Sequence, residues 1–452
     1  MELTPNKIYD EYVKNNIDKF SAADLLFSLI DNSDKENIRV ESIKELEHIG
    51  LNDVKTYKHL EYLLISDSSE KVRNTAALML RNLFLDKVLE PMKWALKHED
   101  SPLCLKTIYL TLLKIIENVV SQDDDISKLV LLTEVEKIEN KEFKIGFETL
   151  RELNGIESFT VAELADILIN YLTFLFLKKT YWRLKFKIES CKIVELDFIF
   201  KGLTHLPEAI KNLSSLKTLI FRYNQIFELP EWIGSLTLLE YLNFNVNNIK
   251  KLPYTIGSLT SLKSLSLWKN EINFIPNTIG LLKSLEVLNL RINDLKELPK
   301  NIGDLTLLKE LNLHDNKLEV IPHSIGSLSL LKNLNLSWNN LLVIPETIGS
   351  LHSLEILDLE RNELRSIPES IGSLKSLQIL NLSDNKLLEL PESLGCLSSL
   401  QNLNISRNFL KTLPKSLIKL SNLKEIYLAD NKLNDISNIV EELEDKGVQI
   451  YY

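Results

Sequence analysis

The side chains best suited to bind another protein are large aromatic residues and arginines that recur in the C-terminal half of the chain. Most of them stand at the two positions before asparagines that recur at a constant interval, as Asn224, Asn247 and Asn270 do. At protein interfaces, truncating such a side chain often costs about 2 kcal/mol or more. The residues that we expect to contact a partner are Arg222, Tyr223, Tyr241, Trp268, Arg291, His314, Trp338 and Arg361.

Residues for catalysis do not fall into a recognisable arrangement. The sequence has no GxxxxGKS or GxxxxGKT phosphate loop, no GxGxxG and no HExxH. His314 precedes Asp315, but such a pair on a solvated strand more often binds a partner than acts as a base. Cys104, Cys191 and Cys396 follow no metal or disulfide spacing. We therefore expect no catalytic, cofactor-binding or metal-binding residues; the remote alternative is an enzyme of unrecognised type where the helical part of the chain meets the repeats.

Composition narrows the classes of partner. The 452-residue chain has a net charge of −10 and no block of basic residues, which argues against nucleic acid, because neutralising phosphates needs clustered Lys and Arg. The longest apolar run, Ile167 to Leu177, has about half of the ~20 residues that a membrane-spanning helix needs. Met1 to Asp10 lacks the apolar stretch of a signal peptide. We expect a cytoplasmic protein without a membrane span.

The asparagines belong to a strictly periodic pattern. One repeat runs from Leu239 to Leu259, and Leu242-x-Phe244 alternates within it like a short strand whose apolar side faces inward. Asn247 follows where the chain turns, so its amide can bond to backbone groups that the turn leaves unpaired. Such a period is typical of a solenoid, in which neighbouring coils bury one another's apolar residues. The asparagines expected to form a structural ladder are Asn224, Asn247, Asn270, Asn293, Asn316, Asn339, Asn362, Asn385, Asn408 and Asn431.

Proline and glycine columns predict the other side of each coil. Pro253 has a fixed φ and cannot donate to a sheet, so the return segment is expected to be irregular or helical. Gly257, and the glycines at the same place in other repeats, suit a close approach between neighbouring coils.

Strand alternation predicts that the aromatic and arginine side chains lie on the concave side of the solenoid. About eleven strands spaced ~4.8 Å apart give a sheet about 50 Å long, enough for a standard protein interface. The later repeats carry mostly Ser, Asp, Asn and Gln at these positions. We hypothesise that a protein partner docks on the earlier two-thirds of this face. The alternative is that Trp268 and Trp338 lie flat on neighbouring strands and fill the curve.

The repeat form LxxLxxLxLxxNxLxxLPxxIGxL resembles the leucine-rich repeat, and more narrowly its 23-residue intracellular Ras-associated subclass of SHOC-type and Ras-suppressor-type scaffolds. The resemblance covers residues 193–436, about eleven repeats. It implies an α/β solenoid, a horseshoe with a parallel sheet on its concave face. It also implies a cytosolic scaffold in signal transduction, often for small GTPases or phosphatases.

Both ends of the repeats depart from the pattern. Residues 181–200 contain two alternating segments and are expected to form an N-terminal cap hairpin and the first strand. Residues 437–452 are expected to form a C-terminal cap helix and a last strand, with Gly447 at the usual place after a helix.

The region before the repeats shows helical periodicity instead. Asp67 to Ala77 resembles the HEAT repeat, in which a turn acid and a helix arginine tie adjacent units, and a weak period of about 33 relates Asp34, Asp67 and Asp100. We expect an all-α HEAT-like helical domain over residues 1–120 and further helices over 121–180 that pack onto the solenoid. The acidic and basic columns are expected to serve as helix caps and ion pairs between units.

The sequence as a whole predicts a non-enzymatic protein-protein interaction scaffold or adaptor, acting as a monomer. A more specific alternative is a regulator of a Ras-like small GTPase or of an associated phosphatase complex.

Overall fold

The computed structural model describes residues 3–434 and 436–452. The chain divides into two compact units. Residues 1–184 with 188–193 form the helical unit, and residues 185–187 with 194–452 form the solenoid unit.

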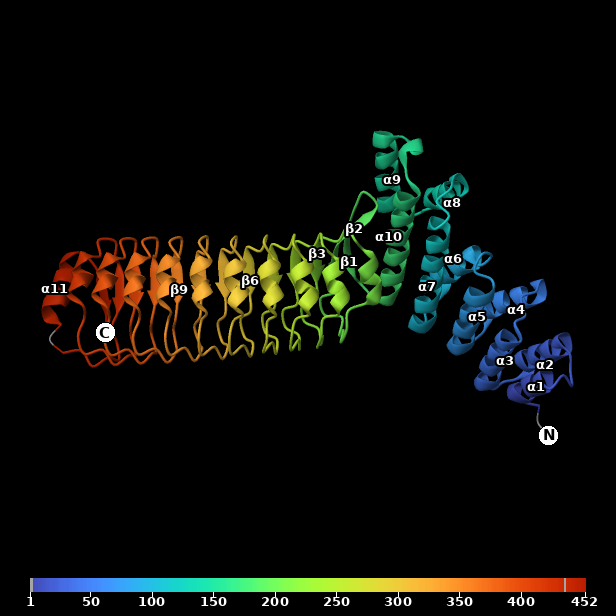
Figure 1. Ribbon diagram of the computed structural model, residues 1–452, viewed down its shortest axis with the longest axis horizontal. Helices are drawn as coiled ribbons and strands as arrows, with labels where there is room; N and C mark the ends of the chain where they lie inside the picture. The colour runs from blue at the N-terminus through green and yellow to red at the C-terminus, as the bar shows by residue number, and fades with distance from the viewer. Residues whose placement is uncertain (1–2, 435) are drawn as a thin grey trace. The chain divides into compact units, whose positions relative to one another are not determined.

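The helical unit consists of α-helices joined by short turns (Figure 1). The helices are α1 Pro5–Val13, α2 Lys19–Asn32, α3 Glu36–Ile49, α4 Val54–Ser66, α5 Glu70–Leu83, α6 Leu89–His98, α7 Pro102–Val120, α8 Asp125–Glu136, α9 Lys141–Asn154 and α10 Val161–Thr180, with a short 3-10 turn, η1, at Ile156–Ser158.

Polar residues cap several of these helices, but the acids of the predicted column do not: the N-caps of α5 and α7 are Ser69 and Ser101, in place of Asp67 and Asp100. Elsewhere the Asp53 side chain accepts from Thr56 N at 2.8 Å, and Thr160 and Glu163 form a reciprocal capping box.

Ion pairs link successive helices of this unit. The Arg39 guanidinium lies 2.6 Å from Asp67 Oδ2, which is the kind of inter-unit pair that the sequence predicts. The repeating pattern would pair Arg73 with Asp100, but Arg73 instead donates to both Glu99 oxygens, at 2.7 and 2.9 Å. Glu99, directly after α6, is buried, whereas the Asp100 side chain is almost fully exposed.

The sheet of the solenoid follows the order of the chain. Its pairs are parallel from β2 onward, and equivalent residues such as Leu288 and Leu311 are in register. The parallel solenoid sheet predicted from the sequence is therefore confirmed. The strands are β1 Lys185–Glu189, β2 Lys192–Asp197, β3 Thr218–Ile220, β4 Tyr241–Asn243, β5 Ser264–Ser266, β6 Val287–Asn289, β7 Glu310–Asn312, β8 Asn333–Asn335, β9 Ile356–Asp358, β10 Ile379–Asn381, β11 Asn402–Asn404, β12 Glu425–Tyr427 and β13 Gln449–Tyr451.

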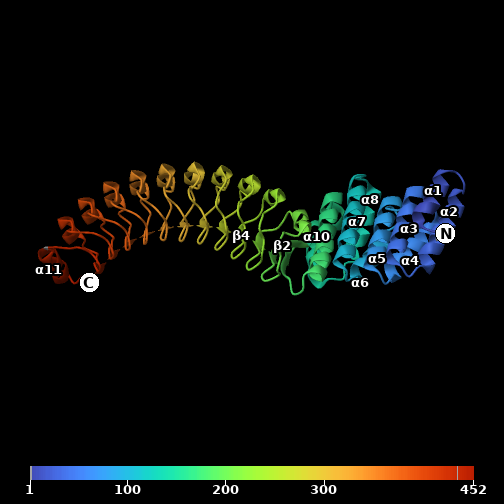
Figure 2. The ribbon, with the colours of Figure 1, turned by 90° about the horizontal axis from the view of Figure 1, so that it is seen from below.

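Short 3-10 helices form the outer side of each coil, and Figure 2 shows the strands along the inner side of the curve. Each begins directly after a proline such as Pro253, whose φ is −68°. The 3-10 helices are η2 Glu208–Asn212, η3 Glu231–Ser235, η4 Tyr254–Ser258, η5 Asn277–Leu281, η6 Lys300–Asp304, η7 His323–Ser327, η8 Glu346–Ser350, η9 Glu369–Ser373, η10 Glu392–Cys396 and η11 Lys415–Lys419; the α-helix α11, Ser437–Asp445, follows them.

The glycine column marks the closest approach between coils, as predicted. A Cβ placed on Gly234 would lie 2.5 Å from Thr255 O in the next coil. A side chain of any size there would force two coils apart.

The asparagine ladder is a set of buried hydrogen bonds between coils. Asn316 Nδ2 donates to Leu290 O in the preceding coil at 3.0 Å and to Leu313 O at 3.1 Å. Its Oδ1 accepts from Leu295 N at 3.1 Å. The same three kinds of bond recur at all ten asparagines. The predicted structural role of the ladder is confirmed.

The residue before each ladder asparagine has a left-handed backbone, a feature that the sequence analysis does not anticipate. These residues have φ between 54° and 58°, although none of them is a glycine. Val246 and Ile292, both β-branched, hold the conformation at the greatest steric cost. The turn into the ladder therefore stores strain in every coil.

Replacing Asn316 by Asp tests the ladder. The change keeps the acceptor for Leu295 N but sets a carboxylate against two carbonyl oxygens, so we expect a loss of about 3 kcal/mol or more in unfolding free energy at pH 7. Because the fold favours the neutral carboxyl, its pKa should be raised, and the deficit against wild type should shrink as the pH falls from 7 to 4.

The matched control for this measurement, denaturant unfolding at several pH values, is Asn312→Asp. Asn312 is half-buried on the concave face, and its Oδ1 accepts from His314 N, a bond that Asp keeps. Equal losses in the two variants would contradict a special role for the ladder position.

Replacing Val246 by Asn tests the strain before the ladder. Asparagine tolerates the left-handed region better than valine, so the variant should be more stable by about 1 kcal/mol in thermal unfolding. The reverse change in an equivalent position, Asp315→Val, should destabilise by a similar amount. A destabilised Val246→Asn protein would show that packing of the valine outweighs its backbone strain.

Candidate functional site

The candidate site is the concave patch, the set of eight residues predicted from the sequence, and the structure places all of them at the surface. Tyr223, Tyr241 and Trp338 are 37%, 50% and 40% exposed. Arg291 and Arg361 are exposed, and Arg222, Trp268 and His314 are half-buried. None of them lies in the apolar interior.

Five of the eight residues lie on five consecutive coils. Trp268, Arg291 and His314 stand two positions after β5, β6 and β7, and Trp338 and Arg361 stand three positions after β8 and β9. Since adjacent strands are ~4.8 Å apart, these side chains form a continuous row. Arg222, Tyr223 and Tyr241 lie on the coils of β3 and β4, beyond the smaller Asn245.

Trp338 contacts a neighbour on each side in this row. The Arg361 guanidinium lies 3.8 Å from its ring centroid, within the range of a cation–π interaction. On the preceding coil the His314 ring is 6.0 Å away, tilted by 51°. The indole is thus held between two neighbours and still keeps 40% of its surface in solvent. It both packs along the curve, as the alternative interpretation holds, and leaves a surface for a partner.

Trp268 is more enclosed. Its backbone N–H donates to Asn245 Oδ1 at 2.9 Å, and Ser266 donates to the same oxygen at 2.7 Å. Its indole Nε1 is buried and has no hydrogen-bond partner among the residues that the structure describes. Part of Trp268 therefore fills the curve, and the rest of the side chain is open to solvent.

His314 is held in a polar environment with one fixed contact. Its Nδ1 is 2.7 Å from Ser337 Oγ, and Ser337 donates in turn to Asn335 Oδ1 at 2.6 Å. Burial and then the charge of Arg291 lower the pKa of His314. The imidazole is therefore neutral at pH 7 and able to accept or donate a hydrogen bond.

Three further aromatic residues of this face were missed by sequence reasoning. Phe200 is 68% exposed and stacks on Tyr223 with ring centroids 4.6 Å apart. It stands one repeat before Tyr223 and shares its positive φ. Comparing the residues before each ladder asparagine with the equivalent residue one repeat earlier would have found it. Tyr427 and Tyr451 stack at 4.5 Å near the other end, but Tyr451 stands one position beyond a full repeat from Tyr427 and so breaks the period.

Metal-binding clusters and membrane-spanning helices are not seen among residues 3–434 and 436–452. No cluster of three or more His, Cys, Asp or Glu side chains there could hold a metal ion. Within the same residues, every helix falls short of the length and apolarity needed to cross a membrane.

Comparison with protein families finds the leucine-rich repeat. A leucine-rich repeat region profile matches residues 191–293 and 256–339, and two leucine-rich repeat profiles match residues 342–387 and 330–351. No curated protein matches the chain.

Comparison with solved structures finds similar solenoids. The leucine-rich repeat ectodomain of a plant membrane receptor kinase from Arabidopsis thaliana, solved in complex with Casparian strip integrity factor 2, is 33% identical with a TM-score of 0.50. The match covers 54% of this chain and only 30% of that one. A leucine-rich repeat protein of Leptospira interrogans is 30% identical over 56% of this chain and 82% of its own, with a TM-score of 0.34.

The pKa of His314 offers a direct test of the geometry at the centre of the patch. By NMR titration it should lie below the ordinary value of about 6.5, and Arg291→Gln should move it upward without restoring it fully, because burial is the larger cause. Since the unfolded chain binds this proton more readily, His314 should favour the fold fully above pH 6.5, and the contribution should fade as the pH drops below that value. An unchanged pKa in Arg291→Gln, or an equal change in the distant Arg407→Gln, would contradict the arrangement.

Proposed function

The chain is a leucine-rich repeat protein, and on that premise we propose that it is a non-enzymatic scaffold that binds a protein partner on the concave face of its solenoid. Solenoids of this kind present extended concave binding surfaces. The observation that supports the proposal is the row of large side chains on five consecutive coils, from Trp268 to Arg361. Aromatic and arginine residues of this kind are the usual anchors of protein interfaces.

Charge on this face favours a partner with an acidic surface opposite the earlier coils. Arg222, Lys269 and Arg291 contribute positive charge there, and neither arginine makes an ion pair with a described residue. The other coils carry both signs at the position of Lys269, namely Asp315, Arg361, Asp384, Arg407 and Asp430. The acidic surface of the partner is therefore expected only opposite Arg222, Lys269 and Arg291.

For the identity of the partner, the 23-residue repeat form favours a Ras-like small GTPase or an associated phosphatase complex. We place the interaction in the cytoplasm, with the chain as a monomer. The state of the cysteines supports a reducing compartment, since Cys104, Cys191 and Cys396 are all free thiols. Titration with purified Ras-like GTPases, loaded with GDP or with a GTP analogue, tests the class of partner.

The double variant Trp268→Ala with Arg291→Ala tests the binding face. If each anchor contributes about 2 kcal/mol or more, the affinity for the partner should fall about a thousandfold. The measurement is quantitative affinity capture, followed by titration of the captured protein. The matched control is Ser406→Ala with Arg407→Ala, which changes the same face on a later coil without removing an aromatic anchor.

Loss of the same partner in both variants would place the contact along the whole face. Unchanged capture by the Trp268 and Arg291 variant, with its thermal unfolding also unchanged, would remove the patch from consideration.

A further inference from the structure

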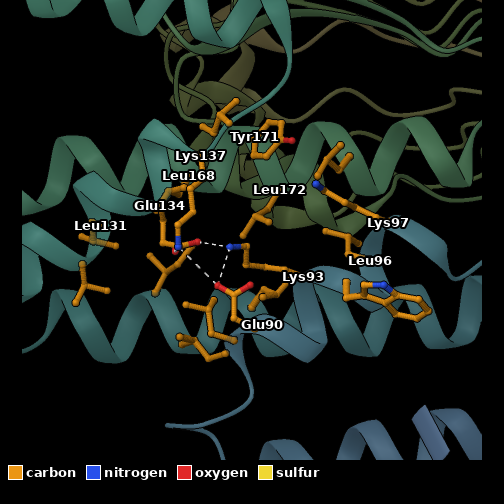
Figure 3. A pocket seen from close by; sticks show the side chains of 18 of the residues that line it. Glu90, Lys93, Leu96, Lys97, Leu131, Glu134, Lys137, Leu168, Tyr171 and Leu172 are labelled. Carbon is orange, nitrogen blue, oxygen red and sulfur yellow. Dashed lines mark hydrogen bonds and ion pairs between the residues drawn. The ribbon is translucent and has the colours of Figure 1, made fainter. Parts of the chain in front are cut away.

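The helical unit contains an apolar cavity that the proposed scaffold function does not use. It measures about 440 Å³ and lies among α6, α7, α8 and α10. Its walls are mostly aliphatic, with Leu112 and Ile116 among them, and Figure 3 shows Leu168 and Leu172 there. Cavities that hold small molecules usually measure ~300–1,000 Å³ and have apolar walls with few polar groups, and this one fits that description.

Four charged side chains at the cavity form ion pairs with one another. Lys93 Nζ lies 2.5 Å from Glu134 and 3.1 Å from Glu90, and Lys137 Nζ lies 2.8 Å from Glu134. Burial alone would raise the pKa of Glu134, but hydrogen bonds from Lys137 and Lys93 outweigh it and hold the pKa below its usual value. Two acids and two bases thus neutralise one another, and this cluster offers no charge to a ligand.

The other polar groups lie at a different end of the cavity and are weakly engaged. Tyr171 and Lys97 both line the cavity, and in Figure 3 both lie away from the Lys93 cluster. Lys97 Nζ is 3.2 Å from Glu139, but both side chains are largely solvated, at 45% and 79% exposed, and such pairs contribute little.

Tyr171 adds a hydroxyl that lacks a partner. Within the described part of the chain, no hydrogen bond reaches it, and its ring packs edge-on against Phe143 at 5.4 Å. Burial, and then the charge of Glu139, raises the pKa of Tyr171, so the group stays a neutral donor. A donor and a cation at the mouth of an apolar cavity are complementary to a carboxylate.

We propose that this cavity binds one long-chain carboxylate, with the hydrocarbon tail among α6, α7, α8 and α10 and the head group at Lys97 and Tyr171. The head would displace Glu139 from Lys97 and accept a hydrogen bond from the Tyr171 hydroxyl. At about 30 Å³ for a group of the size of a water molecule, the cavity has room for on the order of a dozen methylene groups.

The same volume argues against a partner helix as the occupant. One turn of an α-helix, roughly 10 Å across and 5.4 Å long, occupies on the order of 400 Å³. The cavity would hold a single turn, too little to present apolar side chains at successive turns. A flexible hydrocarbon chain can fill this volume with its whole length.

Calorimetric titration of the full chain with octanoate, decanoate and dodecanoate, below their micellar concentrations, tests the proposal. We expect one site per chain and an affinity that rises about fourfold for each added methylene. Dodecyltrimethylammonium, which has the same tail and a cationic head, should bind at least about tenfold more weakly.

Variants separate the head group from the tail. Lys97→Gln and Tyr171→Phe should each weaken dodecanoate binding about five- to tenfold, whereas Lys58→Gln, at an exposed lysine of α4, should leave it unchanged. Leu168→Trp should fill the cavity and abolish binding. If Leu168→Trp fails to fold, the two head-group variants decide the question.

The proposal is overturned if dodecanoate shows no saturable binding, if affinity does not depend on chain length, or if Lys97→Gln and Tyr171→Phe bind as wild type does. Saturable binding of an amphipathic helical peptide in place of dodecanoate would likewise overturn it.

Discussion

The buried asparagine side chain between coils is the interaction on which the solenoid depends. A single coil is too short to pair its own turn groups, and a buried backbone group without a partner costs about as much as a lost hydrogen bond. Each asparagine satisfies backbone groups in its own coil and in the one before it, as Asn316 does at Leu313 O and Leu290 O. The ladder therefore holds the spacing of the coils as well as the turn within each.

This constraint also determines which side chains lie on the concave face. Because the turn must place the asparagine inward, the residue before it takes a left-handed backbone and presents its side chain on the concave side, as at Tyr223, Trp338 and Arg361. The residues just before the ladder asparagines thus lie at the surface as a by-product of a buried hydrogen bond. Their side chains can vary without altering the interior, and this is why aromatic and arginine residues can collect on five consecutive coils.

The repeats could be predicted from the sequence far better than their exceptions. Period, strand, ladder and the close approach at Gly234 all follow from residue types that recur without a slip. The irregular features could not be predicted from the residue types. The strained φ of Val246 is one example: the rest of the coil stabilises this conformation, so the residue at that position need not be a glycine. Phe200 lies in a repeat whose asparagine is replaced by Lys201, so a comparison of repeats that starts at the first asparagine misses it.

In the helical unit, Glu99 replaces Asp100 as the partner of Arg73 because burial at a helix end, and not sequence spacing, selects the acid.

We propose that a partner lies against the inner side of the coils of β5 to β9. Site-specific photo-crosslinking tests it most directly, with a photoreactive amino acid in place of Ser264 on β5 or, in a separate protein, of Ser258 at the outer end of η4. The partner should crosslink to position 264 and not to position 258. Crosslinking at position 258 with none at 264 would show that the partner uses the outer side of the coils, and would contradict binding to the inner side.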